Sequence, residues 1–215
     1  MTAFNDSQPI PNLIAYASSV KNLGSEQSGT GYPSGVDRAI LGWRSARRFK
    51  PDPIPEALLA EILELAVRAP TCRLAQPWRF TVPGAQTTAR LAEVGHQVML
   101  EQGGQLAAEG TRKLLLDAPR LVGVSVAYAD PGNPRFVDED FAAVCCAIQN
   151  FTLAAFERGL AVWWRSGALV RDSRTNSALQ LEPLEHLVGL LHIGYPLACV
   201  ECELKSAASK TRWLE

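Results

Sequence analysis

The segment from Asp138 to Arg158 constrains the fold more than any other part of the 215-residue chain. Its apolar residues recur at helical spacing on one face, and most of the opposite face is apolar as well. This pattern predicts a central, buried helix. Asp138 is the candidate N-cap and Gly159 the candidate C-terminal cap.

The rest of the chain alternates between short strands and helices. Strands are expected at residues 78–82, 121–127, 160–164 and 186–196, and helices at 36–44, 56–69, 87–101, 105–116 and 171–180. Residues 1–35 are rich in Gly, Ser, Pro and Asn, which is typical of a flexible extension or one draped over a partner. We therefore expect one α+β domain over residues 36–215, with few strands and dominant helices.

Composition excludes several function classes. The formal net charge of −1 gives no general attraction to nucleic acid or to an anionic membrane, so any anion site must be local. No apolar run approaches the ~20 residues of a membrane span. The first twenty residues lack the basic start and apolar core of a signal peptide. A cytoplasmic protein without a membrane or nucleic-acid partner is expected.

The five cysteines are an odd number, which fits reduced thiols better than a disulfide framework. Cys199 and Cys202 have C-x-x-C spacing, but no second pair lies nearby to complete a zinc site, and no metal is expected. Cys145 and Cys146 fall in the apolar 138–158 segment and are interpreted as core residues.

Side-chain catalysis has no recognisable signature in this sequence. The three histidines belong to no H-E-x-x-H motif, and no G-x-S-x-G or phosphate-binding G-x-x-x-x-G-K occurs. Each histidine is interpreted as structural or as a surface residue. A chain of this kind needs a cofactor to carry a reaction, and no catalytic side chain is predicted.

Two arginine-bearing segments suit an anionic ligand. Arg44, Ser45 and Arg47 lie in R-S-A-R-R, where guanidinium groups and a hydroxyl could bind phosphate oxygens together. The run GLAVWWRSGAL, residues 159–169, ends an apolar strand in two tryptophans and then turns polar at Arg165 and Ser166. An arginine, a hydroxyl and a glycine at a strand end suit a planar, anionic ligand.

Four ordered motifs together resemble the nitroreductase family of flavoproteins. They are RSARRF, APTCRLAQPW, GLAVWWRSGA and HLVGLLHIGYP, and the resemblance covers about residues 37–212. It is closest to the short, single-domain branch with a W-R-S-G-A segment. The resemblance implies a nitroreductase-like α/β sandwich, with a small mixed sheet wrapped by helices. It also implies an intertwined homodimer with FMN at the interface and the 138–158 helix in the dimer core.

The resemblance also assigns cofactor contacts to individual positions. Arg44, Ser45 and Arg47 match the phosphate and ribityl contacts, and Trp164, Arg165, Ser166 and Gly167 match the segment at the flavin ring. Trp43 stands where the family often has another arginine, which leaves its backbone as the contact. Arg68, Cys72 and Gln76 match a loop that contacts flavin, from the same or from the neighbouring subunit. Lys210 and Arg212 resemble a K-x-R pair that reaches the phosphate in larger relatives.

One position departs from the family pattern. Leu74 replaces an asparagine whose amide addresses the pyrimidine edge of the flavin. FMN binding is still expected, while substrate scope and redox potential are left open. The implied function is two-step reduction of nitroaromatic, quinone or related acceptors by NADH or NADPH through flavin N5. The alternatives are a flavin-dependent oxidase or dehalogenase of a specific metabolite, and a flavin-binding protein without turnover.

Overall fold

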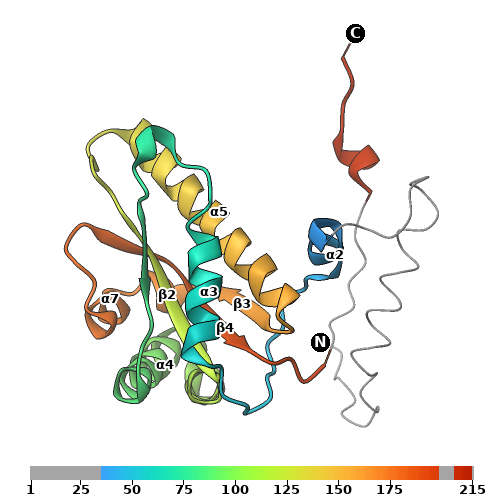
Figure 1. Cartoon of the computed structure of the whole chain (residues 1–215). Coiled ribbons are helices and arrows are strands. Elements are labelled where there is room, and N and C mark those ends of the chain that lie inside the picture. Colours follow the sequence, from blue (N-terminus) through green and yellow to red (C-terminus); the bar gives the residue numbers. More distant parts are fainter. Residues whose placement is uncertain (1–34, 199–205, 215) are drawn as a thin grey trace.

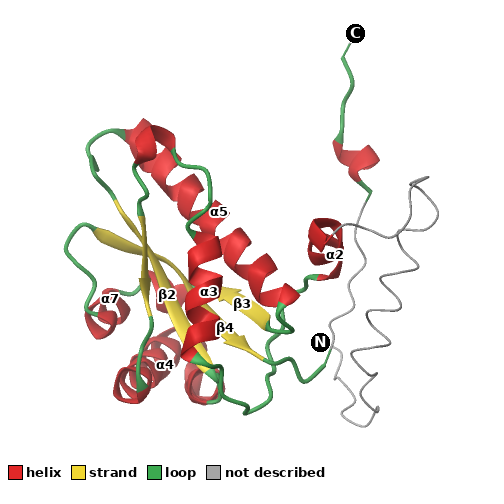
Figure 2. Cartoon of the chain, viewed as in Figure 1, coloured by secondary structure: helices red, strands yellow, loops and turns green. Residues whose placement is uncertain are grey.

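The computed structural model of the chain describes residues 35–198 and 206–214. Most of the expected 1–35 extension and the Cys199–Cys202 pair lie outside these residues. The described chain folds as a four-stranded sheet with helices on both faces (Figures 1 and 2). No helix in residues 35–198 or 206–214 is long and apolar enough to cross a membrane.

The sheet has the strand order β1-β2-β4-β3 and is antiparallel at every pairing. Its strands are β1 (Trp78–Thr81), β2 (Arg120–Ala127), β4 (Glu185–Gly194) and β3 (Ala161–Arg165). The α+β sandwich is confirmed, but the expected mixed sheet is wrong for the described strands. β2 and β3 do run in the same direction, yet β4 lies between them and pairs antiparallel with both.

Helices cover the two faces of the sheet in separate layers. One face carries α3 (Glu56–Ala66) and α5 (Pro134–Glu157), which pack on the alternate residues Val122, Val124 and Val126 of β2. The other face carries α4 (Ala85–Leu116), α6 (Ala168–Arg171) and α7 (Ser173–Leu179), which pack on Leu121 and Leu190. Because successive side chains of a strand point to opposite faces, an apolar strand supplies both cores at once.

The central helix α5 begins earlier than the sequence predicts. Its N-cap is Asn133 and Pro134 stands in its first turn, so the expected cap at Asp138 is wrong. Proline is favoured at the first helical position because its missing N–H would be unpaired there in any case. Gly159 follows the helix as expected, and its N–H donates to the Phe156 carbonyl at 2.9 Å.

One face of α5 is left open by the described residues, 35–198 and 206–214. Phe141 is 46% exposed, and Cys146 is exposed rather than part of the core as expected. Cys145 is half-buried and packs against the core, as predicted. α5 is therefore buried against the sheet and α3 but leaves an apolar strip open.

The other predicted helices are present. The helices predicted at 87–101 and 105–116 are the two halves of α4, which is interrupted at Gly104 (φ 76°). Glycine adopts this conformation readily. The chain turns back there, because His96 Nε2 lies 3.3 Å from Glu109 Oε1, whereas thirteen residues of one continuous helix would span about 20 Å. The helix predicted at 171–180 is α7, and the short helix α6 precedes it, divided from it at Asp172. A further helix, α2 (Gly35–Gly42), precedes the arginine segment, and 3₁₀ turns occupy Cys72–Leu74 and Ala207–Lys210.

Candidate flavin site

The arginine segment follows directly on α2. Arg44 Nη1 donates to the carbonyls of Leu41 at 2.8 Å and Trp43 at 2.6 Å, so this side chain closes the end of the helix. Ser45 and Arg47 are exposed. The segment then runs beside the end of β4, where the Lys50 N–H donates to the Tyr195 carbonyl at 2.8 Å. The guanidinium groups are thereby held at one edge of the sheet.

The end of β3 lies against this segment. The Cζ atoms of Arg47 and Arg165 lie 5.2 Å and 5.4 Å from the centre of the Trp163 ring system. These distances are within the range in which a cation is attracted to an aromatic ring. The structure therefore brings together the RSARRF and GLAVWWRSGA motifs, which are more than a hundred residues apart in the chain.

Arg165 is a half-buried cation. Its Nη2 donates to Thr111 Oγ1 at 3.0 Å, while its buried Nη1 has no hydrogen-bond partner in the described residues. Burial lowers the pKa of this guanidinium, and none of the carboxylates that the structure describes pairs with it. Because buried polar groups are nearly always satisfied, the free Nη1 suits an accepting or anionic group of a ligand.

His192 packs against the same tryptophan. Its side chain is 1% exposed, and the centres of the His192 and Trp163 rings are 4.9 Å apart. Burial and the nearby charge of Arg165 lower the pKa of His192 to about 3. The ring is therefore neutral at neutral pH and serves as packing, as expected for a structural histidine.

Trp164 points to the opposite face of the sheet from its neighbours Trp163 and Arg165. Its indole lies against Gly189. A Cβ atom at Gly189 would clash with Trp164 Nε1, and this N–H points to the Val188 carbonyl at 3.4 Å. The indole is 36% exposed. Trp164 thus presents a fixed aromatic surface at the strand end, which is the position predicted for a flavin contact.

Ser166 and Gly167 open onto a cavity. The cavity has a volume of about 550 Å³ and is lined by Gln102, Ser166, Gly167, Ala168, Arg171 and Asp172. Asp172 is engaged by Arg174 at 2.9 Å, which lowers the pKa of this carboxyl. Arg171 has no such partner among the described residues. The sequence did not predict Gln102, Arg171 or Thr111, because no local pattern reports contacts between helices and a strand that meet only in the folded chain.

The loop of the second motif lies at the other end of α5. Arg68, Cys72, Leu74 and Gln76 are all exposed, and Leu74 is 83% exposed. Arg73 of this loop pairs with Glu139 near the start of α5, whereas Arg38 of α2 pairs with Glu157 at its end. Eighteen helical positions separate these glutamates, a distance of about 27 Å at 1.5 Å per residue. Within one chain, the arginine segment and the loop are therefore far apart.

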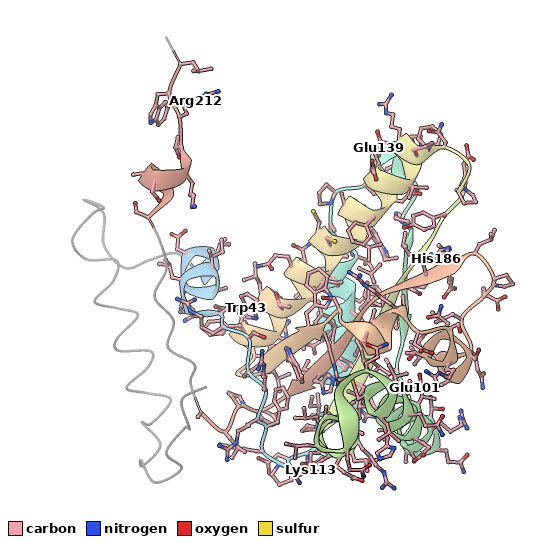
Figure 3. All side chains as sticks on the ribbon, turned by 180° about the vertical axis from the view of Figure 1, so that it is seen from behind. Trp43, Glu101, Lys113, Glu139, His186 and Arg212 are labelled. Carbon is pink, nitrogen blue, oxygen red and sulfur yellow. The ribbon has the colours of Figure 1, made fainter. Side chains whose placement is uncertain are left out.

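The K-x-R pair is also remote from the other motifs. Lys210 and Arg212 are exposed, and Figure 3 shows Arg212 on an arm that extends beyond α2 and Trp43. The structure therefore brings together the predicted contacts of the RSARRF and GLAVWWRSGA motifs. The loop that contains Cys72 and Leu74 and the Lys210–Arg212 pair lie elsewhere. Among the described residues, no three His, Cys, Asp or Glu side chains are grouped as metal ligands.

Comparison with known proteins identifies the family of this chain. Residues 40–195 match the sequence profile of the Nitroreductase family. The chain belongs to the nitroreductase family. The Bacillus subtilis protein YfhC, which carries the provisional name of an NAD(P)H nitroreductase, is 32% identical over 159 residues. The match covers 73% of this chain and 82% of YfhC.

Solved nitroreductase structures share the fold. A nitroreductase-like protein from Bacillus cereus is 28% identical and superposes with a TM-score of 0.76, covering 87% of this chain and all of its own. The FMN-dependent nitroreductase NfnB of Mycobacterium smegmatis, solved in complex with NADPH, has a TM-score of 0.70 at 20% identity. It covers 84% of this chain and 98% of NfnB, and at this identity it supports the fold alone.

Proposed function

We propose that this chain is an FMN-dependent oxidoreductase that uses NADH or NADPH to reduce nitroaromatic, quinone or related acceptors. The observation that carries the proposal is the cluster at the end of β3. There the guanidinium of Arg165, whose buried Nη1 has no partner among the described atoms, lies with the Trp163 ring beside Arg47 of the arginine segment. The Trp164 indole is exposed on the other face of the same strand end. The nitroreductase family to which the chain belongs supports the same conclusion. We expect the protein to act in the cytoplasm.

The donors at this edge fit FMN. Arg47 and Ser45 are exposed donors that suit a phosphate, and Arg44 can join them with the guanidinium atoms that do not cap α2. The free Nη1 of Arg165 supplies a charged donor, and the buried Trp43 Nε1 also lacks a partner among the described atoms. Gly167 has open space around it, so a planar ring could approach the backbone closely there.

Bound FMN would supply the hydride chemistry, with N5 as the atom that accepts and returns the hydride. The protein would orient the ring with Trp164 and stabilise electron-rich groups with the Arg165 charge. Ser166 and Gly167 would present polar groups at the ring edge. None of these residues needs to exchange a proton. His192 could not do so at neutral pH, since its pKa is about 3 and its side chain is buried.

We further propose that two subunits share each flavin site. The open apolar strip on α5 supports this, because exposed apolar surfaces of this kind commonly mark interfaces. Val36 and Ile40 of α2, 65% and 55% exposed, add to the uncovered apolar surface. The separation of about 27 Å along α5 is a second argument. The loop with Cys72 and Leu74 can border a flavin held at the arginine segment most simply from a partner subunit.

A mixed-subunit experiment tests the shared site. One chain carries Arg44→Ala and Arg47→Ala, and the other carries Cys72→Asp and Leu74→Asp, which place carboxylates in the loop. Each homodimer should bind FMN poorly. If the sites are shared, the mixed dimer contains one site with no substitution and regains about half the flavin of the wild type. Mixed dimers as deficient as both parents would show that each site belongs to one chain.

Steady-state kinetics test the reaction itself. With a nitroaromatic or quinone acceptor, initial rates at several fixed acceptor concentrations should give parallel double-reciprocal lines against NADH or NADPH. This pattern is expected when the first product leaves before the second substrate binds. Intersecting lines would refute the two-step order. Tight flavin binding without turnover would favour the alternative, a flavin-binding protein, which the loss of the family asparagine at Leu74 makes conceivable.

A further inference from the structure

The loop at residues 71–76 has an unusual backbone. Arg73, Leu74 and Gln76 all have positive φ angles, of 55°, 54° and 45°, although none of them is glycine. The backbone N–H groups of the turn bond locally: Ala75 N–H donates to the Cys72 carbonyl at 3.0 Å, and Gln76 N–H to Thr71 Oγ1 at 3.2 Å. A conformation of this kind persists only where its surroundings impose it.

The side chains that face solvent in this loop cannot impose it. Cys72, Leu74 and Gln76 are exposed, and Leu74 is 83% exposed. Arg73 is different, because its guanidinium reaches back to the first two turns of α5. It pairs with Glu139, lies 3.5 Å from Asp140 Oδ1, and sits 3.6 Å from the centre of the Phe136 ring.

The three contacts use different parts of the guanidinium. Its face stacks on the Phe136 ring, while its Nη atoms point to the two carboxylates. Asp140 is 2% exposed, and Arg73 is the only cation within ion-pair distance of it in the described chain. A planar, forked cation suits this arrangement, and neither a neutral amide nor a compact ammonium reproduces it.

We infer that Arg73 is a positioning residue for the flavin site, a role that rests on the proposed function. It holds the wall formed by Cys72, Leu74 and Gln76 in its strained shape and fastens that wall to α5. Because α5 also carries the open apolar strip, the loop keeps a fixed place relative to the proposed subunit interface. Arg73 touches no flavin itself in this account; it fixes the residues that do.

The neighbouring Arg135 provides a matched control. It pairs with the same Glu139 at 2.8 Å, one helical turn away, and its side chain is 80% exposed. Removing Arg135 takes a positive charge from the same surface, but it removes none of the side-chain contacts that fasten the loop to α5. The variants are therefore Arg73→Gln, Arg73→Lys and Arg135→Gln, prepared in the full-length chain.

The experiment measures the dissociation constants of FMN and riboflavin, the visible absorption spectrum of the bound flavin, and the melting temperature of each flavin-free protein. If the loop keeps its binding shape about one tenth of the time in Arg73→Gln, both affinities fall about tenfold. The affinities for FMN and for riboflavin should fall equally, because the loop would border the flavin ring and not the phosphate. The spectrum should shift, Arg73→Lys should recover part of the loss, and Arg135→Gln should match the wild type.

Several results would overturn the inference. Unchanged affinities in Arg73→Gln would do so, as would a loss confined to FMN, which would place Arg73 at the phosphate. An equal loss in Arg135→Gln would reveal a general effect of charge on α5. If Arg73→Gln does not fold because Asp140 is left unpaired, the double variant with Asp140→Asn takes its place with the same expectation. A wild-type protein that binds neither flavin would refute the proposed function itself.

Discussion

Lowering the pH from about 7 to about 5 should destabilise this protein through His192. The side chain is 1% exposed and packs on the Trp163 ring, beside the Arg165 guanidinium. Its Nε2 has no hydrogen-bond partner among the described atoms. Burial and the charge of Arg165 lower its pKa to about 3, and a contact with the Leu114 backbone offsets this only in part.

The size of the effect follows from proton linkage. The unfolded chain binds a proton at His192 near the ordinary pKa of 6.5, whereas the folded chain does so near 3. Between these values unfolding takes up a proton, so the free energy of unfolding falls as the pH drops below 6.5. At about pH 5 the loss from this one group is about 2 kcal/mol, since one pKa unit corresponds to ~1.4 kcal/mol.

Urea unfolding of His192→Leu checks this prediction. The variant cannot bind the proton, so its stability should fall by about 2 kcal/mol less than that of the wild type between about pH 7 and pH 5. His186→Gln, an exposed position in the same strand, should keep the wild-type dependence. Protein and flavin concentrations stay fixed, because assembly and binding contribute to apparent stability. Equal pH dependence in His192→Leu and the wild type would refute the reasoning.

Three further predictions concern the flavin site. Arg47→Ala should weaken the binding of FMN by about 1.5–3 kcal/mol, the value of a charge-assisted hydrogen bond, and that of riboflavin far less. Equal losses of affinity for both ligands in a binding titration would show that Arg47 has a structural role instead. Leu74→Asn should increase the affinity for FMN by no more than about tenfold and raise the flavin midpoint potential. Asparagine tolerates a positive φ, and its amide can donate a hydrogen bond to the flavin ring. A lowered potential would show that residue 74 does not contact the ring. Gly189→Ala should cost about 1–3 kcal/mol of stability and perturb bound flavin, because its methyl group displaces the Trp164 indole; a wild-type melting curve and flavin spectrum would contradict this.

Much of the fold is predictable because its elements depend on local patterns. The β-branched run at β2 and the apolar period of α5 specify their own structure, since each supplies the surface on which the next layer packs. The break in α4 at Gly104 was also predictable, because two glycines separate the helical patterns at 87–101 and 105–116. How the two halves pack, with His96 beside Glu109, depends on contacts that no local pattern reports.

The candidate site was predictable in part. The tryptophans and Arg165 at the end of β3 were visible as a polar ending on an apolar strand. The partners of Arg165 were not, since Thr111 lies on α4 and meets it only once the sheet and helix have packed. No role for Arg73 followed from the sequence. Its importance depends on Asp140 and Phe136, which the end of α5 brings next to the loop.

Anaerobic titration of the purified protein with NADH and NADPH tests the central claim most directly. The protein should carry FMN that is not covalently bound, and its visible absorption should bleach on addition of at least one nicotinamide. Adding a nitroaromatic or a quinone should then restore the oxidised spectrum. A colourless protein that takes up no added FMN would contradict the account, as would bound flavin that neither nicotinamide can reduce.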